Sequence, residues 1–357
     1  MMNNEIINSE KKSAFCVSIL KSGKIVKIEG SSPSDFISSL KEADITWIDF
    51  AVKDINNTNE IAASFEFSQQ LVSVLLSNFS NYFSAYEDLD TEMGLMIPAV
   101  RVENLVIHFY PLLILIKKNL VLTLHETEVI RLLRFYRYAG IFMQKIDPKL
   151  SEKDKITILL TRILDENNNG NFEHLRRIEE NGDEISRHLM DPTIPRGTLG
   201  PEIYKMKHAL IKYLDALWAT LDVISSLHYG DAELLTDDKI LLTKITALAE
   251  DINRQISLGE HMSEVLASGL EVLQSIYNNQ LQILNNRLAF VVTWLTILGT
   301  ALLVPNTIAT IFGNPVFNLT NKDILWYSAL LIISTILSVW VAYLWVKKRG
   351  FLKFKID

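Results

Sequence analysis

The longest uncharged stretches of this chain lie near its C-terminal end. Residues 288–312 contain no charged side chain, and residues 324–346 contain none either. Each stretch exceeds the roughly 20 apolar residues that cross the hydrocarbon core of a bilayer. Core helices of soluble proteins seldom run so long without a charge, so a buried helical hairpin is the weaker alternative. The pattern predicts transmembrane helices over residues 288–313 and 324–346, joined by an external loop, residues 314–323.

A narrow apolar seam precedes the first predicted span. Its residues recur at helical spacing of three or four positions and are Ile245, Leu248, Ile252, Met262, Leu266, Leu270, Leu273, Tyr277, Leu281, Leu284 and Leu288. This spacing predicts a stalk helix over residues 238–287 that continues into the membrane. Unbroken to Gly313, the helix would be about 110 Å long. One small domain cannot bury such a seam, so the pattern predicts an oligomer.

The N-terminal part mixes two kinds of hydrophobic periodicity. Alternation predicts a hairpin over residues 14–28 and strands over residues 45–50, 107–116 and 120–126, while helical spacing marks residues 31–43, 60–78 and 127–145. The last of these helices should carry Arg131, Arg134 and Arg137 on a solvated face. This mixture predicts an α+β cytoplasmic domain over residues 1–146, a mixed sheet layered with helices.

The pattern then becomes wholly helical over residues 147–237. It predicts helices over residues 151–168, 171–190 and 201–229, the last two separated by the breaker-rich segment DPTIPRGTLG.

The distribution of charged residues predicts how the two spans are oriented in the membrane. The chain has 357 residues, is 48% hydrophobic and carries a net charge of −7, which divides into +4 from residue 288 onward and −11 before it. Basic side chains crowd the predicted tail, residues 347–357, so the positive-inside rule places both termini in the cytoplasm of a multi-pass cell-membrane protein. The polar first residues predict no signal peptide. The acidic balance argues against nucleic-acid binding.

The sequence offers little for enzymatic or cofactor chemistry. One cysteine, Cys16, and seven scattered histidines exclude a disulfide framework and any cysteine-based zinc or iron–sulfur site. No Walker A, GxGxxG or HExxH motif occurs, and His125-Glu126 is a lone pair at a strand end. We therefore expect no enzyme and no organic cofactor.

A polar stripe runs along the first predicted span. Thr293, Thr296, Thr300, Thr307, Thr310 and Asn314 are spaced 3, 4, 7, 3 and 4 residues apart. At the helical period they fall within about 100° of one another. The hydroxyls either bond back to carbonyls of their own helix and mediate packing, or they line an ion path suited to hydrated hard cations. The absence of charge within the spans argues against a proton-relay pump.

In these features the whole chain resembles the CorA-type magnesium transporter family. The stretches that carry the resemblance are residues 46–49, 120–126, 204–227, 268–270 and 295–300. The resemblance implies a funnel-shaped homopentamer in which the first spans line a central pore, with Mg²⁺ as both the transported and the regulatory ion. Asn306 and the polar stripe are then pore residues, and Val292, Leu295 and Leu303 form a hydrophobic gate.

The family's signature, Gly-Met-Asn, is altered in this chain. Gly313 matches, but Asn314 and Pro315 stand where the family has methionine and asparagine. Either Asn314 supplies the ligand amide from a position shifted by one residue, or the selectivity differs, as in zinc-transporting relatives that also vary the motif.

The family also implies regulatory carboxylates between the N-terminal domain and a neighbouring stalk. The candidates are Glu87, Asp88, Asp90, Glu92 and Glu103 in the domain and Glu250 and Asp251 in the stalk. The alternative is that each of these acids is simply solvated.

Together, these observations predict a pentameric, channel-like transporter of divalent cations, Mg²⁺ first, which closes when internal divalent ions fill interdomain sites. Two alternatives remain open. One is transport of zinc or another divalent ion by the same fold, and the other is a membrane-anchored scaffold or sensor that has lost conduction, with Pro315 as its sign.

Overall fold

The computed structural model describes residues 14–103, 105–190, 197, 199–228, 232–314, 316–317 and 320–348. Expectations for Pro315, for most of the breaker-rich segment and for the tail beyond Lys348 lie outside these residues. The chain divides into two compact units, Met1–Leu270 and Glu271–Asp357. Helix α8, Lys239–Phe312, is continuous and contributes to both units.

A mixed sheet organises the first unit, as predicted. Its strands are β1 (Ala14–Leu20), β2 (Ile25–Gly30), β3 (Ala43–Val52), β4 (Ala85–Asp88), β5 (Met93–Glu103), β6 (Val106–Lys117) and β7 (Leu120–Glu126). They lie in the order β2-β1-β3-β7-β6-β5-β4. Strands β3 and β7 are parallel, and the other neighbours are antiparallel. The predicted β1–β2 hairpin is confirmed, with Gly23 at φ +79° in its turn.

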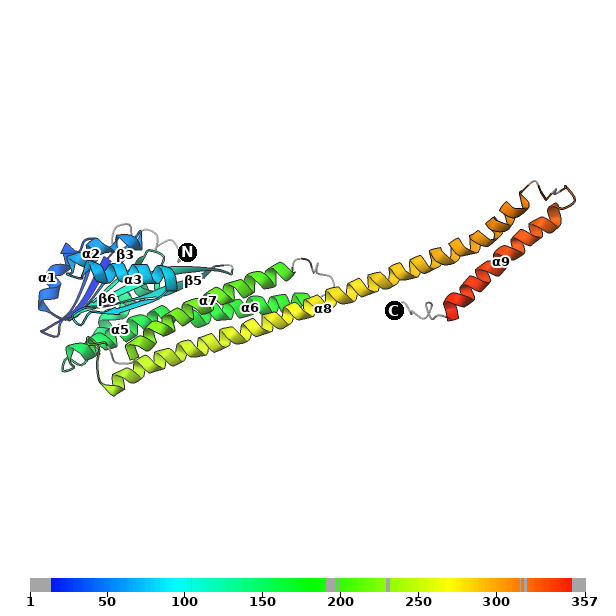
Figure 1. Cartoon of the computed structure of the whole chain (residues 1–357). Helices are drawn as coiled ribbons and strands as arrows, with labels where there is room; N and C mark the ends of the chain where they lie inside the picture. The colour runs from blue at the N-terminus through cyan, green and yellow to red at the C-terminus, as the bar shows by residue number, and fades with distance from the viewer. Residues whose placement is uncertain are drawn as a thin grey trace, which may run out of the picture. The chain divides into compact units, whose positions relative to one another are not determined.

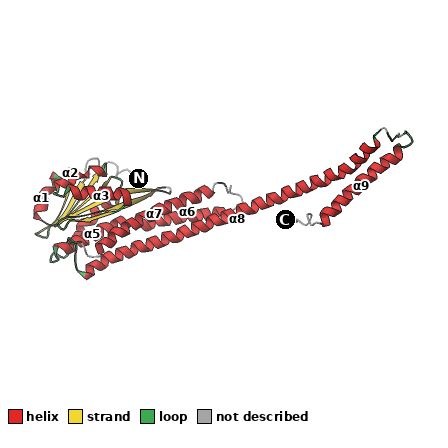
Figure 2. Cartoon of the chain, in the orientation of Figure 1, coloured by secondary structure: helices red, strands yellow, loops and turns green. Residues whose placement is uncertain are grey.

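Helices cover both faces of this sheet (Figures 1 and 2). One face carries α1 (Ser34–Glu42), a short 3₁₀ turn (Ile55–Thr58), α2 (Asn59–Ser64) and α3 (Gln69–Tyr82). Phe36, Leu71 and Leu75 from these helices are fully buried in one cluster with Ile48 and Leu122 of the central strands. Burial of this apolar layer is the main force that holds the helices on the sheet.

The single helix predicted over residues 60–78 is wrong, because the chain breaks between α2 and α3. Glu66 adopts φ +63° at the break, and Ser68 caps α3 by accepting the Leu71 N–H. Phe65 and Phe67 on either side of Glu66 are both buried. Residues two apart cannot share one face of a continuous helix, so interrupting the helix lets both rings enter the core.

The opposite face of the sheet carries the helices that follow β7. They are α4 (Arg131–Met143), α5 (Glu152–Asn168), α6 (Asn171–Met190) and α7 (Leu199–His228). Trp47 of β3 packs against Phe135 of α4 at a ring-centroid distance of 4.7 Å. Arg134 and Arg137 are exposed as predicted, but Arg131 is half-buried, so the solvated face predicted for all three is only partly correct.

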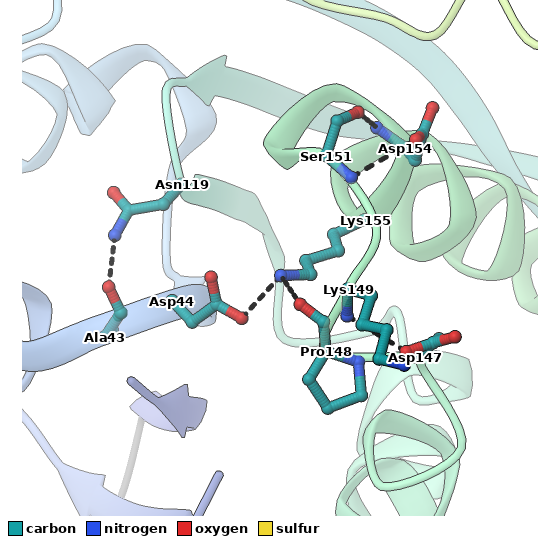
Figure 3. Close-up of polar contacts among 9 residues, drawn as sticks. All are labelled: Ala43, Asp44, Asn119, Asp147, Pro148, Lys149, Ser151, Asp154 and Lys155. Atoms are coloured by element: carbon teal, nitrogen blue, oxygen red, sulfur yellow. Dashed lines mark hydrogen bonds and ion pairs between the residues drawn. The ribbon is translucent and has the colours of Figure 1, made fainter. Parts of the chain in front are cut away.

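A partly buried ion pair joins α5 to the sheet (Figure 3). Lys155 Nζ donates to Asp44 Oδ2 at 2.7 Å and to the Pro148 carbonyl at 2.9 Å. Ser151 and Asp154 form a reciprocal capping box at the start of α5, which fixes where the helix begins. The Lys155 ammonium therefore replaces its lost hydration with one carboxylate and one carbonyl.

The stalk seam is buried over its first half within its own chain. Ile245, Leu248 and Ile252 are almost inaccessible, and Met262, Leu266 and Leu273 are also buried. The cytoplasmic helices therefore cover this half of the seam. From Tyr277 to Leu288 the same seam is exposed in the single chain.

A second polar cluster is buried between β3 and β7. His125 Nε2 lies 3.1 Å from Asp49 Oδ2, and Thr123 donates to the other oxygen of that carboxylate and accepts from Trp47 Nε1 at 3.0 Å. Burial lowers the pKa of His125, but the Asp49 carboxylate outweighs it, and the pKa is raised above its ordinary value. His125 is thus one half of a buried ion pair.

We expect Asp49→Asn to lower the free energy of unfolding by about 3 kcal/mol, because it leaves a buried imidazolium without its counter-ion. The raised His125 pKa means that the pair stabilises fully below about pH 6.5 and weakens as pH rises through the folded-state pKa. Chemical denaturation followed by circular dichroism should therefore show a larger loss at about pH 6 than at about pH 9. Glu180→Gln, which removes the exposed Arg176–Glu180 pair, is the control and should change little. A pH-independent loss would contradict the ion-pair assignment.

Candidate functional site

The second unit is a hairpin of two apolar helices, the end of α8 and α9 (Ile324–Lys348). Both are long and apolar enough to cross a membrane, and their most apolar windows are only 11% and 6% buried. A hairpin in a soluble core would be mostly buried, so the alternative weighed from sequence is not supported. Ile297 and Ala301 of α8 are buried, at 3% and 1% exposure. They mark the side of α8 that packs against α9.

One proline creates the polar contact between these helices. Pro305 lies inside α8 and has no N–H, so the carbonyl of Ala301, four residues earlier, loses its helical donor. Ser338 of α9 lies 2.8 Å from that carbonyl oxygen and 3.0 Å from the Thr335 carbonyl of its own helix. Ser338 was not among the residues predicted from the sequence. The free carbonyl could be predicted from the proline, but its partner depends on how α9 packs.

The predicted polar stripe lies mostly at exposed positions of α8. Thr293 is half-buried, and the other four threonines are exposed in the single chain. Each hydroxyl donates to the carbonyl four residues earlier, at 2.7–2.8 Å. The back-bonding expected of threonines in a membrane helix is therefore present at all five.

Back-bonding does not exclude a role in ion binding. A hydroxyl has one hydrogen and two acceptor lone pairs, so a threonine that donates to its own helix still presents an oxygen outward as an acceptor. A row of such oxygens suits a partner that brings hydrogen-bond donors, such as the water shell of a hydrated cation. The two interpretations of the stripe are thus compatible in one geometry.

Two of the threonines also border an open groove. Thr296 and Thr300 line a cavity of about 740 Å³ between α8 and α9, together with Val304, Ser338 and Trp345. The groove is almost wholly apolar apart from these hydroxyls. One edge of the stripe therefore lies next to α9.

The predicted gate residues also lie on exposed positions of α8. Val292, Leu295 and Leu303 are 59%, 62% and 61% exposed. Asn306 is exposed as well, and its carbonyl accepts the Thr310 hydroxyl at 2.7 Å. None of these side chains is used to pack the α8–α9 hairpin.

The altered signature forms the end of α8. Gly313 donates its N–H to the Ala309 carbonyl at 2.9 Å, directly after the helix ends at Phe312. Phe312 packs against Phe317 at 5.3 Å and against Trp326 at 6.0 Å, between ring centroids. Asn314 is exposed, and its Oδ1 accepts the Val316 N–H at 3.3 Å. Its amide therefore stands at the tip of the hairpin and helps to shape the turn.

The predicted regulatory acids are dispersed over the first unit. Asp88 accepts the N–H groups of Asp90 and Glu233 at 3.1 and 3.2 Å. Glu103 forms an ion pair with Arg101 at 2.5 Å. In the stalk, Asp251 pairs with Arg254, while Glu250 is exposed.

Within the described part of the chain, these carboxylates do not combine into a metal site. No three histidine, cysteine, aspartate or glutamate side chains come close enough there to hold an ion. Glu92, another of the predicted acids, is buried and accepts the N–H of Ser68 at 3.1–3.2 Å. It therefore holds the residue that caps α3. A regulatory site built from the remaining acids would need a second chain.

Comparison with protein families gives one match that spans most of the chain. The model of a family described as "CorA-like Mg2+ transporter protein" matches residues 42–348. A search of curated proteins gives no match.

Several solved structures share the fold. The complete CorA magnesium transporter from Methanocaldococcus jannaschii aligns with a TM-score of 0.66 at 20% identity over 93% of this chain and 97% of that one. The full-length CmaX protein gives a TM-score of 0.63 at 13% identity over 96% and 99%. The ZntB cytoplasmic domain from Vibrio parahaemolyticus RIMD 2210633 gives 0.50 at 15% identity over 66% and 88%. The TM-scores show a shared fold at these low sequence identities.

We expect Ser338→Ala to destabilise the α8–α9 hairpin by about 1 kcal/mol, because it removes the donor to the Ala301 carbonyl. Ser334→Ala is the matched control, since Ser334 bonds only within α9, to the Leu331 carbonyl. In a Pro305→Ala background the helix regains an N–H for Ala301, so Ser338→Ala should then cost less. Thermal unfolding in detergent measures all four variants. Equal costs with and without Pro305 would contradict this account.

Proposed function

This chain belongs to the CorA-like Mg²⁺ transporter family, and from that premise we propose that it conducts Mg²⁺ through a pore at the centre of a homopentamer. Family membership makes the chain a membrane-integral ion transporter. The ion, the oligomer, the pore residues and the gating are our proposals. The observation that carries them is the stripe of threonine oxygens that stand as acceptors at exposed positions of α8.

In the proposed pore, five copies of this face surround one axis. Mg²⁺ holds its water shell tightly, and that shell presents O–H donors outward. Threonine oxygens whose own hydrogens are committed to the helix accept from those waters without stripping them. The Asn314 amide stands at the outer end of the same stripe and meets the hydrated ion first.

The apolar side chains on the same face provide the closed state. Val292 and Leu303 are exposed in the single chain, and around a five-fold axis they would form narrow apolar rings. Such rings stop ions by excluding water. Widening them by a small rotation of α8 would readmit water and open the path.

The exposed half of the stalk seam supports the oligomer. Tyr277, Leu281, Leu284 and Leu288 are 38–56% exposed over three turns of α8. A continuous apolar stripe of this kind requires a partner helix. We propose that the same residues of neighbouring copies cover it.

The ligand chemistry favours magnesium over softer metals. Residues 288–346 contain no histidine, cysteine or methionine, which are the side chains that zinc and copper recruit. The oxygen-only path therefore suits a hard, hydrated cation. Because Asn314 replaces the usual motif residue, zinc transport by the same fold is the alternative that the flux experiment must exclude.

We propose that both termini are cytoplasmic. Lys347 and Lys348 close α9, and the basic tail follows them, which matches the positive-inside rule. Divalent ions in the cytoplasm would then bind between Asp88 or Asp90 of one copy and Glu250 or Asp251 of the next, and hold the pore closed. The −11 net charge of residues 1–287 favours such binding.

We expect Thr300→Val to reduce Mg²⁺ flux into dye-loaded liposomes by about tenfold or more, because five acceptors are lost at one level of the pore. Thr300→Ser should restore most of the flux. Thr335→Val is the control, since Thr335 back-bonds in the same way but belongs to α9.

The same flux assay shows which ion is transported and whether Asn314 takes part in its transport. We expect Mg²⁺ flux to exceed Zn²⁺ flux and to fall in Asn314→Ala. Zinc flux above magnesium flux would support the zinc alternative. A folded oligomer that conducts neither ion would contradict the proposed function and support the scaffold.

We expect Glu250→Gln to raise the internal Mg²⁺ concentration that halves the flux by about threefold, because the site loses one carboxylate charge. Glu250 is the sharper target, since Asp251 already pairs with Arg254. Glu260→Gln is the control, since Glu260 is also an exposed acid and lies ten residues further along α8. Unchanged inhibition in Glu250→Gln would remove this residue from the regulatory site.

A further inference from the structure

A basic cavity lies in the first unit, far along the chain from the pore residues. It measures about 340 Å³ and forms where the end of β5, the first turns of α4 and the start of α6 meet. Four arginines line it, one from β5, two from α4 and one from α6: Arg101, Arg131, Arg134 and Arg177. Three glutamates, Glu103, Glu128 and Glu173, line it as well. This concentration is unexpected in residues 1–287, which carry a net charge of −11.

Arg131 is held in the wall of the cavity by neutral groups. Its guanidinium donates to the Asn167 carbonyl, to Asn171 Oδ1 at 3.2 Å and to the Val100 carbonyl at 3.3 Å. It also donates to His174 Nε2 at 2.8 Å. A side chain at Gly170 would collide with this guanidinium, so the glycine leaves it room.

His174 is a neutral residue in the lining of this cavity. Burial, and then the charges of Arg131 and Arg177, lower its pKa to about 4. The ring is therefore neutral at physiological pH, and it accepts from Arg131 through Nε2. Its proton then resides on Nδ1, which is buried, so the ring adds no charge to the cavity.

Two of the four guanidiniums have no carboxylate partner in the described part of the chain. Arg101 pairs with Glu103 at 2.5 Å, and Arg177 pairs with Glu173 at 2.8 Å. Arg131 and Arg134 form no ion pair among the described residues, although Glu128 also borders the cavity. The Nη1 and Nη2 groups of Arg131 already donate to four neutral acceptors, so Arg131 contributes positive charge to the wall of the cavity. The exposed Arg134 is the guanidinium that can turn its N–H groups toward an anion.

We propose that this cavity binds a phosphate-bearing small molecule. Arginine matches phosphate oxygens with bidentate hydrogen bonds, and here the guanidiniums approach from separate elements. A tetrahedral group with three free oxygens can use several such forks, whereas a carboxylate is satisfied by one. The volume is at the lower end of small-ligand sites, about 300–1,000 Å³, so there is room for more than a bare phosphate.

The test is isothermal titration calorimetry of the full-length protein in detergent with inorganic pyrophosphate, in Mg²⁺-free buffer. We expect saturable binding that Arg134→Ala weakens about tenfold or more, because one charged hydrogen-bonding group is lost. Arg137→Ala is the matched control. Arg137 is exposed on the same helix and does not line the cavity, and its substitution removes the same charge.

Three outcomes would overturn the proposal. They are the absence of saturable binding, an equal loss in Arg134→Ala and Arg137→Ala, and citrate binding as tight as pyrophosphate with the same dependence on Arg134. Arg177→Gln, on α6, provides a second variant and should also weaken binding. Because binding is measured without flux, these results are independent of the proposed transport function.

Discussion

Inside a bilayer every polar group of the backbone must find a partner within the protein, and this requirement shapes the membrane hairpin. Helix α8 meets it by ordinary helical bonding, except at the carbonyl that Pro305 leaves free. Ser338 satisfies that carbonyl, so the polar defect and the α9 contact coincide on one side of the helix. The threonine stripe lies beside this contact at mostly exposed positions, and Thr296 and Thr300 also line the groove between the two helices.

The cytoplasmic unit follows a related rule for charge. Lys155 with Asp44, and His125 with Asp49, are buried in compensated pairs that tie α5 and β7 to β3. The guanidinium of Arg131 departs from this pattern, because its partners are carbonyls, an amide and an imidazole. That difference separates buried charges that are balanced by a carboxylate from one that is held by neutral groups alone.

Much of this architecture could be predicted from periodicity, because a strand or helix that buries one face has apolar residues at regular intervals in its own sequence. The hairpin of β1 and β2, the strands on either side of Asn119 and the two spans were predicted in this way. The break at Glu66, the burial of Arg131 and the Ser338 contact could not be, since each depends on a neighbour distant in sequence. The signature at Gly313 located the end of α8 but does not by itself assign the role of Asn314.

The neutrality of the threonine stripe has a consequence for the energy that moves the ion. Oxygens that touch only the water shell bind the ion weakly, so residence at each level of the proposed path would be short. Two charges crossing a potential of 100 mV gain about 4.6 kcal/mol of electrical work. Such a path needs no chemical fuel, because the membrane voltage and the concentration difference together set the direction and the extent of accumulation.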